Sequence, residues 1–184
     1  TCRPSYANWQ GGDAYLSLHS NAGGGDSCGG NTCTGAARGT ETYMYDGTAT
    51  AGSQQLRDSV QAEMVRAIQT NHDASWVDRG KKSAPFGEVH YLATMPGALV
   101  ESAFHDGAVD NPWLQNAYWR HDMARGIYKG ILRFLRGSSA IVLPLPVHSV
   151  AAHYDGGPDV IIRWSPRPDP LEGSATATGY RVYV

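Results

Sequence analysis

Long apolar runs and a surplus of charge of either sign are both missing from this sequence. No stretch approaches the roughly 18 consecutive apolar residues of a membrane-spanning helix, so no such helix is expected. Fifteen Lys and Arg residues stand against seventeen Asp and Glu residues, which gives a formal charge of −2. Because nucleic-acid binding depends on a basic surface, it is not an expected function. A Gly-x-Ser-x-Gly elbow, a P-loop and a His-Glu-x-x-His motif are also absent.

Cysteine is scarce as well, with only Cys2, Cys28 and Cys33 present. Cys28 and Cys33 lie in the glycine-rich run GGGDSCGGNTCTG with C-x4-C spacing, and no second pair exists to complete a four-ligand zinc knuckle. The pair therefore either closes a small disulfide loop or stays as free thiols. A disulfide would imply an oxidising compartment.

The residues that are present suffice for a packed core, since 41% are apolar and 10% aromatic. Periodicity and turn residues predict helices and strands in alternation, which is typical of an α/β layer structure. The predicted elements are strands at 13–22, 40–45, 89–92 and 98–104, and helices at 53–70 and from Asn111 to about Gly137. The intervening segments are predicted to be irregular at 1–12, a glycine-rich loop at 23–39 and a polar loop at 77–86.

The character of the sequence changes after residue 137. Pro144 and Pro146 lie in a predicted linker over 138–146. Strand-like segments follow at 147–153, 160–164 and 179–184, separated by runs rich in turn residues. These segments predict the beginning of a small all-β module.

Two residues inside or at the end of predicted strands are candidates for chemistry. His19 lies at the end of its strand, where binding sites of α/β sheets are usually built. Glu101 lies within ALVESAF, and a carboxylate inside an apolar strand is costly unless it is paired, protonated or linked to a metal. Such a carboxylate can serve as a general base with a raised pKa. The alternatives are that His19 only bonds a loop carbonyl and that Glu101 is a structural partner of Arg79.

Three further residues are candidates for lining the same site. Asn21 follows His19 closely, and His105 and Asp106 follow the strand that carries Glu101. These side chains could face the site or simply solvent.

The order of the motifs DAYLSLHSNA, RGTETYMY, DRGKK and MPGALVESAF resembles the C-terminal half of the zinc-dependent N-acetylmuramoyl-L-alanine amidases (peptidoglycan amidase family 3) over residues 13–136. The resemblance implies a twisted sheet flanked by helices. It also implies that His19 is a zinc ligand and that Glu101 assists the water that attacks the substrate. The scissile bond would be the amide between N-acetylmuramic acid and L-alanine of peptidoglycan, in a secreted, periplasmic or cell-envelope setting.

Two departures from the family accompany this resemblance. The family's N-terminal half, with its other zinc ligands, is not in this sequence, so those ligands are expected upstream and the chain alone is expected to bind zinc weakly and to be inactive. The residues after Glu101 also differ, since they read Ser-Ala-Phe-His-Asp-Gly over 102–107.

The tail resembles the first half of a fibronectin type III domain, in which Trp164 and Tyr180 match core aromatic residues. The expected organisation is therefore an amidase-like domain at 1–137, a linker at 138–146 and a partial fibronectin type III-like module at 147–184. Two other functions stay open: a catalytically inactive cell-surface protein that binds glycans or mediates adhesion on the same fold, and a lyase or hydrolase that acts on another extracellular glycan.

Overall fold

The computed structural model describes residues 2–24, 28–29 and 32–183. Parts of the predicted glycine-rich loop (25–27 and 30–31) and Val184 of the last predicted strand lie outside these residues. The chain divides into two compact units, residues 1–138 and 139–184. Each unit has its own strands, and the candidate site residues all belong to the first.

The described strands of the first unit build a four-stranded mixed sheet with the order β1-β6-β4-β5. Their bounds are Tyr15–Asn21 for β1, Thr40–Met44 for β4, Asp78–Ser83 for β5 and Gly97–Phe104 for β6. β6 pairs with β1 in parallel and with β4 in antiparallel orientation, and β4 pairs with β5 in parallel. The strands predicted at 13–22, 40–45 and 98–104 are confirmed, and the mixed α/β fold with them.

The strand β5 corrects a sequence-based prediction, because the polar segment DRGKKS predicts a loop. That prediction is wrong for a physical reason. β5 is an edge strand that needs no apolar face of its own, and charged side chains suit an exposed sheet edge. Its long basic side chains Arg79 and Lys82 reach Glu41 on the neighbouring strand β4.

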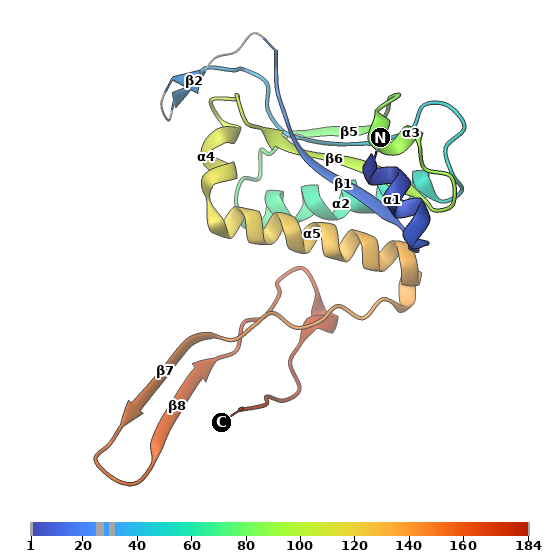
Figure 1. Cartoon of the computed structure of the whole chain (residues 1–184). Helices are drawn as coiled ribbons and strands as arrows, with labels where there is room; N and C mark the ends of the chain where they lie inside the picture. Colours follow the sequence, from blue (N-terminus) through green and yellow to red (C-terminus); the bar gives the residue numbers. More distant parts are fainter. Residues whose placement is uncertain (1, 25–27, 30–31, 184) are drawn as a thin grey trace. The chain divides into compact units, whose positions relative to one another are not determined.

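Two long helices cover one face of the sheet (Figure 1). In α2 (Ser53–Asn71), the predicted apolar positions Leu56, Val60, Met64 and Ile68 are all completely buried, which confirms the helix and its core face. Here α2 lies against β4 and β6, and α5 (Ala117–Arg136) packs against α2. The helices α2 and α5 do not cover the opposite face of the sheet.

The single helix predicted from Asn111 is in fact two helices, α4 (Asp110–Gln115) and α5. Asn116 interrupts them with an extended backbone, ψ 118°. Its side-chain oxygen accepts hydrogen bonds from the backbone N–H groups of Tyr118 and Trp119, at 2.9 and 3.3 Å. Asn116 therefore acts as the N-cap of α5, because its oxygen supplies partners for donors that no helical carbonyl reaches.

Close approach between α2 and α5 depends on two glycines of α5. A Cβ atom on Gly130 would lie 2.5 Å from Cα of Val60, and one on Gly126 would lie 2.9 Å from Cα of Met64. Such distances are shorter than any real Cβ contact, so the helix backbones touch where these glycines lie. The periodicity of apolar residues does not predict this contact between the helix backbones.

Two short helices replace segments for which the sequence predicts other structure. Residues 2–10, expected to be irregular, form α1 (Cys2–Gln10), and the strand predicted at 89–92 is replaced by α3 (Gly87–His90). The two lie side by side, because the Asn8 side chain donates to the carbonyl of Tyr91 at 2.8 Å and accepts from the N–H of Ala93 at 3.0 Å. Both predictions are wrong because short segments without clear periodicity take their structure from such tertiary contacts.

The second unit contains an antiparallel pair, β7 (His148–Tyr154) and β8 (Val160–Ser165), and a short 3-10 turn at Gly173–Ala175. The third strand predicted from Gly179 does not form over residues 179–183, which is a correction. Tyr180 nonetheless contacts Trp164 edge to face, with ring centroids 5.5 Å apart. Among the described helices of the chain, none is both long and apolar enough to span a membrane.

Candidate functional site

One residue from each of three neighbouring strands forms a row across the sheet. In the β1–β6 pairing His19 is the partner of Glu101, and in the β6–β4 pairing Glu101 is the partner of Glu41. Directly opposed residues on adjacent strands project from the same face with Cβ atoms about 5 Å apart. The two residues singled out from the sequence, His19 and Glu101, are therefore immediate neighbours, and Glu41 is a third member that sequence analysis missed.

His19 has oxygen atoms around its imidazole Nε2. The Ser17 hydroxyl lies 2.9 Å from this nitrogen, and Oε1 of Glu88, on α3, lies 4.0 Å away. Ser17 precedes His19 by two residues, so both project from the same face of β1. The His19 side chain keeps 29% of its surface exposed, so the ring is accessible from solvent as well as held by its neighbours.

Glu101 is a carboxylate with few partners. Its Oε2 atom is buried and has no hydrogen-bond partner among the described residues. Burial, followed by the charges of Glu41 and Glu88, raises the pKa of Glu101 from 4.5 to about 7. The alternative in which Arg79 pairs with Glu101 is wrong, because Arg79 donates from Nε to Oε2 of Glu41 at 2.7 Å.

Glu41 differs from Glu101 because its carboxylate has several hydrogen-bond partners, although it is only 2% exposed. Its carboxylate accepts from Arg79, Lys82, Tyr43 and Asn21. Burial alone would raise the pKa of Glu41, but the hydrogen bonds from Lys82, Arg79 and Tyr43 outweigh it and lower the pKa. Burial and the bond to Glu41 raise the pKa of Tyr43 to about 12, so its hydroxyl remains a donor. The signal for Glu41 was available in the sequence, since TETYMY is another strand that carries a carboxylate.

The described residues do not supply a complete metal site. No group of three or more His, Cys, Asp or Glu side chains in this part of the chain is arranged to hold a metal ion. His19 fits as one ligand, because its accessible imidazole already lies among oxygen atoms and a zinc site uses such nitrogen donors. His105 and Asp106 do not join His19 in such a group.

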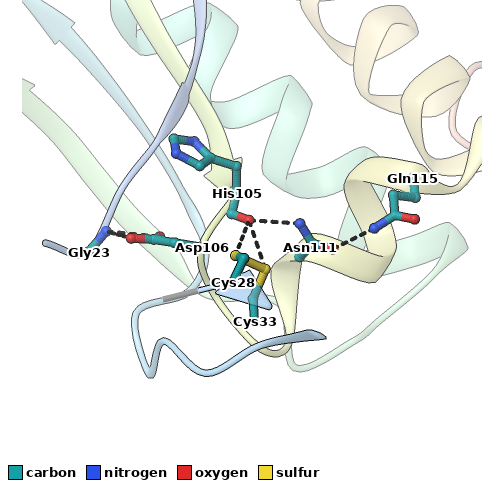
Figure 2. The surroundings of a disulfide bond; sticks show 7 residues. All are labelled: Gly23, Cys28, Cys33, His105, Asp106, Asn111 and Gln115. Carbon is teal, nitrogen blue, oxygen red and sulfur yellow. Dashed lines mark hydrogen bonds between the residues drawn. A yellow bond between two sulfur atoms is a disulfide. The ribbon is translucent and has the colours of Figure 1, made fainter. Parts of the chain in front are cut away.

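His105 and Asp106 instead lie where the glycine-rich loop meets the end of β6. Both carboxylate oxygens of Asp106 accept from the N–H of Gly23, at 2.9 and 2.7 Å, so Asp106 holds the start of the loop (Figure 2). The ring of His105 is exposed, and its Nδ1 lies 3.2 Å from the hydroxyl of Ser20. Asn21, at the end of β1, reaches across β6 to donate to Glu41 at 2.6 Å.

Cys28 and Cys33 form a disulfide within this loop, with their sulfur atoms 2.07 Å apart. They lie on the short strands β2 (Cys28–Gly29) and β3 (Thr32–Cys33), which pair in antiparallel orientation. Figure 2 shows both sulfur atoms near the backbone carbonyl of His105, at 3.7 and 3.4 Å, and Asn111 donates to the same oxygen at 2.7 Å. The disulfide loop thus lies against the segment that directly follows the strand of Glu101.

Known proteins resemble the first unit of this chain in sequence. The N-acetylmuramoyl-L-alanine amidase family model matches residues 1–133. The N-acetylmuramoyl-L-alanine amidase CwlM of Bacillus licheniformis is 33% identical over 133 residues, which cover 72% of this chain and 45% of CwlM. LytC of Bacillus subtilis (strain 168), an amidase of the same name, is 34% identical over 125 residues, which cover 67% of this chain and 22% of LytC. The chain thus spans less than half the length of these curated relatives.

Solved structures show the same likeness. The amidase of Clostridium difficile 630 superimposes with a TM-score of 0.62 and 28% identity, covering 74% of this chain and 65% of that one. The amidase AmiC2 of Nostoc punctiforme gives a TM-score of 0.58 and 26% identity, covering 73% of this chain and 64% of that one. With most of its first unit matched in sequence and in fold, the chain belongs to the N-acetylmuramoyl-L-alanine amidase family.

Proposed function

We propose that this chain is part of a zinc-dependent enzyme that hydrolyses the amide between N-acetylmuramic acid and L-alanine in peptidoglycan. The observation that carries the proposal is the pairing of His19 with Glu101 on adjacent strands, with one Glu101 oxygen buried and without a donor in the part of the chain that the structure describes. Membership of the amidase family supports it. In this proposal His19 is one zinc ligand, and the others come from residues outside this sequence.

Zinc, when bound, would act as a Lewis acid toward water and the amide carbonyl. Glu101 accepts the proton of the attacking water as the new C–O bond forms at the amide carbon. It then delivers that proton to the amide nitrogen as the C–N bond breaks, which leaves a lactyl carboxylate and the free amino group of L-alanine. Ser17 holds the imidazole of His19 through its hydroxyl, 2.9 Å from Nε2. Because a catalytic zinc needs three protein ligands, we expect the 184-residue chain alone to be inactive.

The enzyme is proposed to act outside the cytoplasm, as a secreted, periplasmic or cell-envelope protein. The Cys28–Cys33 disulfide supports an oxidising compartment. A relative from Bacillus anthracis, 29% identical over 160 residues, is described as an uncharacterized cell wall amidase. The substrate, peptidoglycan, lies in the same compartment as the proposed enzyme.

The second unit is proposed to belong to a fibronectin type III-like module. Its support is the antiparallel pair β7–β8 together with the contact between Trp164 and Tyr180. A cavity of about 270 Å³ beside them is lined mainly by apolar residues, which include Val150, Ile162 and Val182. In a complete sandwich a second sheet would cover such a face.

The decisive experiment replaces Glu101 by Gln in a longer chain that contains the remaining zinc ligands. Gln is nearly isosteric, so zinc content is expected to persist, whereas loss of the general base should slow release of muramyl peptides by roughly 10²–10⁴-fold. Glu172→Gln in the second unit serves as the matched control and should keep the wild-type rate. A wild-type rate in Glu101→Gln would refute the assignment of Glu101 as the base.

A further inference from the structure

The carboxylate of Glu41 accepts hydrogen bonds from four side chains near the site. Its Oε1 accepts from the amide of Asn21 at 2.6 Å and from the hydroxyl of Tyr43 at 2.9 Å. Its Oε2 accepts from Nε of Arg79 at 2.7 Å and from Nζ of Lys82. Four donors from three strands therefore converge on one side chain that is only 2% exposed.

The neighbouring carboxylate has nothing comparable. Glu101 is the strand partner of Glu41, and its buried Oε2 lacks a donor among the described residues. The Cβ atoms of such partners lie about 5 Å apart, which the long side chains of Arg79 and Lys82 can easily span. Both cations are about one-third exposed, at 34% and 35% of their side-chain surface, so they have room to turn. Glu41 and Glu101 can thus compete for the same two cations, and Glu41 holds both.

We propose that Glu41 is a positioning residue which, by holding Arg79 and Lys82, prevents them from pairing with Glu101 and so leaves the Glu101 carboxylate without a cation and able to take a proton from water. The inference rests on the proposed function. Its physical basis is that a carboxylate engaged by a guanidinium or an ammonium group has fewer free lone pairs and holds a further proton less well. The fold thereby tolerates the energetic cost of a Glu101 carboxylate without a cation partner, while Arg79 and Lys82 neutralise the charge of Glu41.

The test is a comparison of urea unfolding midpoints of the 184-residue chain at pH 8 with a chelator present, followed by far-UV circular dichroism. Glu101→Gln is expected to raise the midpoint in the wild-type background, because it removes a buried charge beside another carboxylate. In the Glu41→Gln background, where the cations have turned to Glu101, the same substitution is expected to lower the midpoint. A shift of the same sign in both backgrounds would overturn the proposal, because a Glu41 that acts on Glu101 only through its charge would shrink the gain from Glu101→Gln without reversing its sign.

Two further variant backgrounds serve as controls for this comparison. Glu41→Gln combined with Arg79→Gln removes one charge of each sign, so this double variant can replace Glu41→Gln if the single variant does not fold. In the double variant Lys82 is released from Glu41 and should still make Glu101→Gln destabilising. Removing Lys82 as well, by Lys82→Gln, should make Glu101→Gln stabilising again. If Glu101→Gln stays stabilising while Lys82 alone is present, the idea of competition for cations is wrong.

The catalytic consequence is measured separately, in the longer chain that contains the remaining zinc ligands. Glu41→Gln should lower kcat for muramyl-peptide release with little change in KM, and removal of both cations in the same variant should recover part of the loss. The stability shifts do not depend on catalysis. If they occur as expected but Glu101→Gln keeps full activity, the proposed function fails and the competition for cations stands. If they do not occur but Glu101→Gln loses activity, the positioning role fails alone.

Discussion

Replacing Glu101 by Gln should make the stability of the chain less dependent on pH. Burial and the nearby charges of Glu41 and Glu88 place the pKa of Glu101 at about 7 in the folded chain, against 4.5 for an ordinary glutamate. Between these two values the folded state holds a proton that the unfolded state has already lost. The folded wild-type chain therefore loses stability as pH rises from about 4.5 to 7, and above 7 it carries a buried carboxylate. Gln carries no charge at any of these pH values.

The size of the effect follows from this difference in pKa. Each pKa unit corresponds to about 1.4 kcal/mol, so the whole shift, taken without solvent screening, would correspond to roughly 3 kcal/mol. Glu101 is only partly buried, and solvent screening reduces the expected gain to about 1–2 kcal/mol at pH 8. At pH 5 the wild-type side chain is protonated in the folded state, so the two proteins should differ little.

The assay is urea unfolding at pH 5, 6, 7 and 8 in the presence of a chelator, monitored by far-UV circular dichroism. At pH 8 the midpoint of Glu101→Gln should exceed that of the wild type by about half a molar urea, and the difference should vanish toward pH 5. The matched control is Asp46→Asn at an exposed turn, for which the difference from wild type should not follow this profile. A constant difference, or one that grows toward pH 5, would refute the raised pKa of Glu101 and the burial that causes it.

Three further predictions concern other parts of the chain. Gly130→Ala should destabilise the first unit by about 1–3 kcal/mol in urea unfolding, because its Cβ would overlap the α2 backbone, whereas Gly12→Ala should be nearly neutral. Replacing Cys28 and Cys33 by Ser should cost roughly 2 kcal/mol through the lost loop closure and speed amide hydrogen exchange just after β6; unchanged exchange would contradict the contact with His105. The isolated residues 139–184 should show red-shifted Trp164 emission without a cooperative transition, and a cooperative melt with blue-shifted emission would contradict a partial module.

Much of the first unit can be predicted from local sequence pattern. The spacing of Leu56, Val60, Met64 and Ile68 specifies α2 and its buried face, because an apolar stripe at helical spacing has only one way to leave water. Alternation and β-branched or aromatic residues likewise specify β1, β4 and β6. In each case the residues of the element itself favour its secondary structure.

Elements whose structure depends on partners could not be predicted in this way. The charged segment of β5 becomes a strand only because β4 offers it a pairing edge, and α1 is held through Asn8 by residues more than eighty positions away. The break at Asn116 depends on a local cap within a continuous helical pattern, which periodicity alone does not resolve.

The candidate site shows the same division. Local pattern is enough to single out His19 and Glu101 as polar residues in or beside apolar strands, since an ionisable group in that position is costly unless something stabilises it. Their pairing on adjacent strands, the position of Glu41 next in the row, and the bond of Arg79 to Glu41 instead of Glu101 emerge only in the folded sheet. The physical reason is that strand order and register are set by the packing of the whole sheet, so no local pattern can state which charges will face each other.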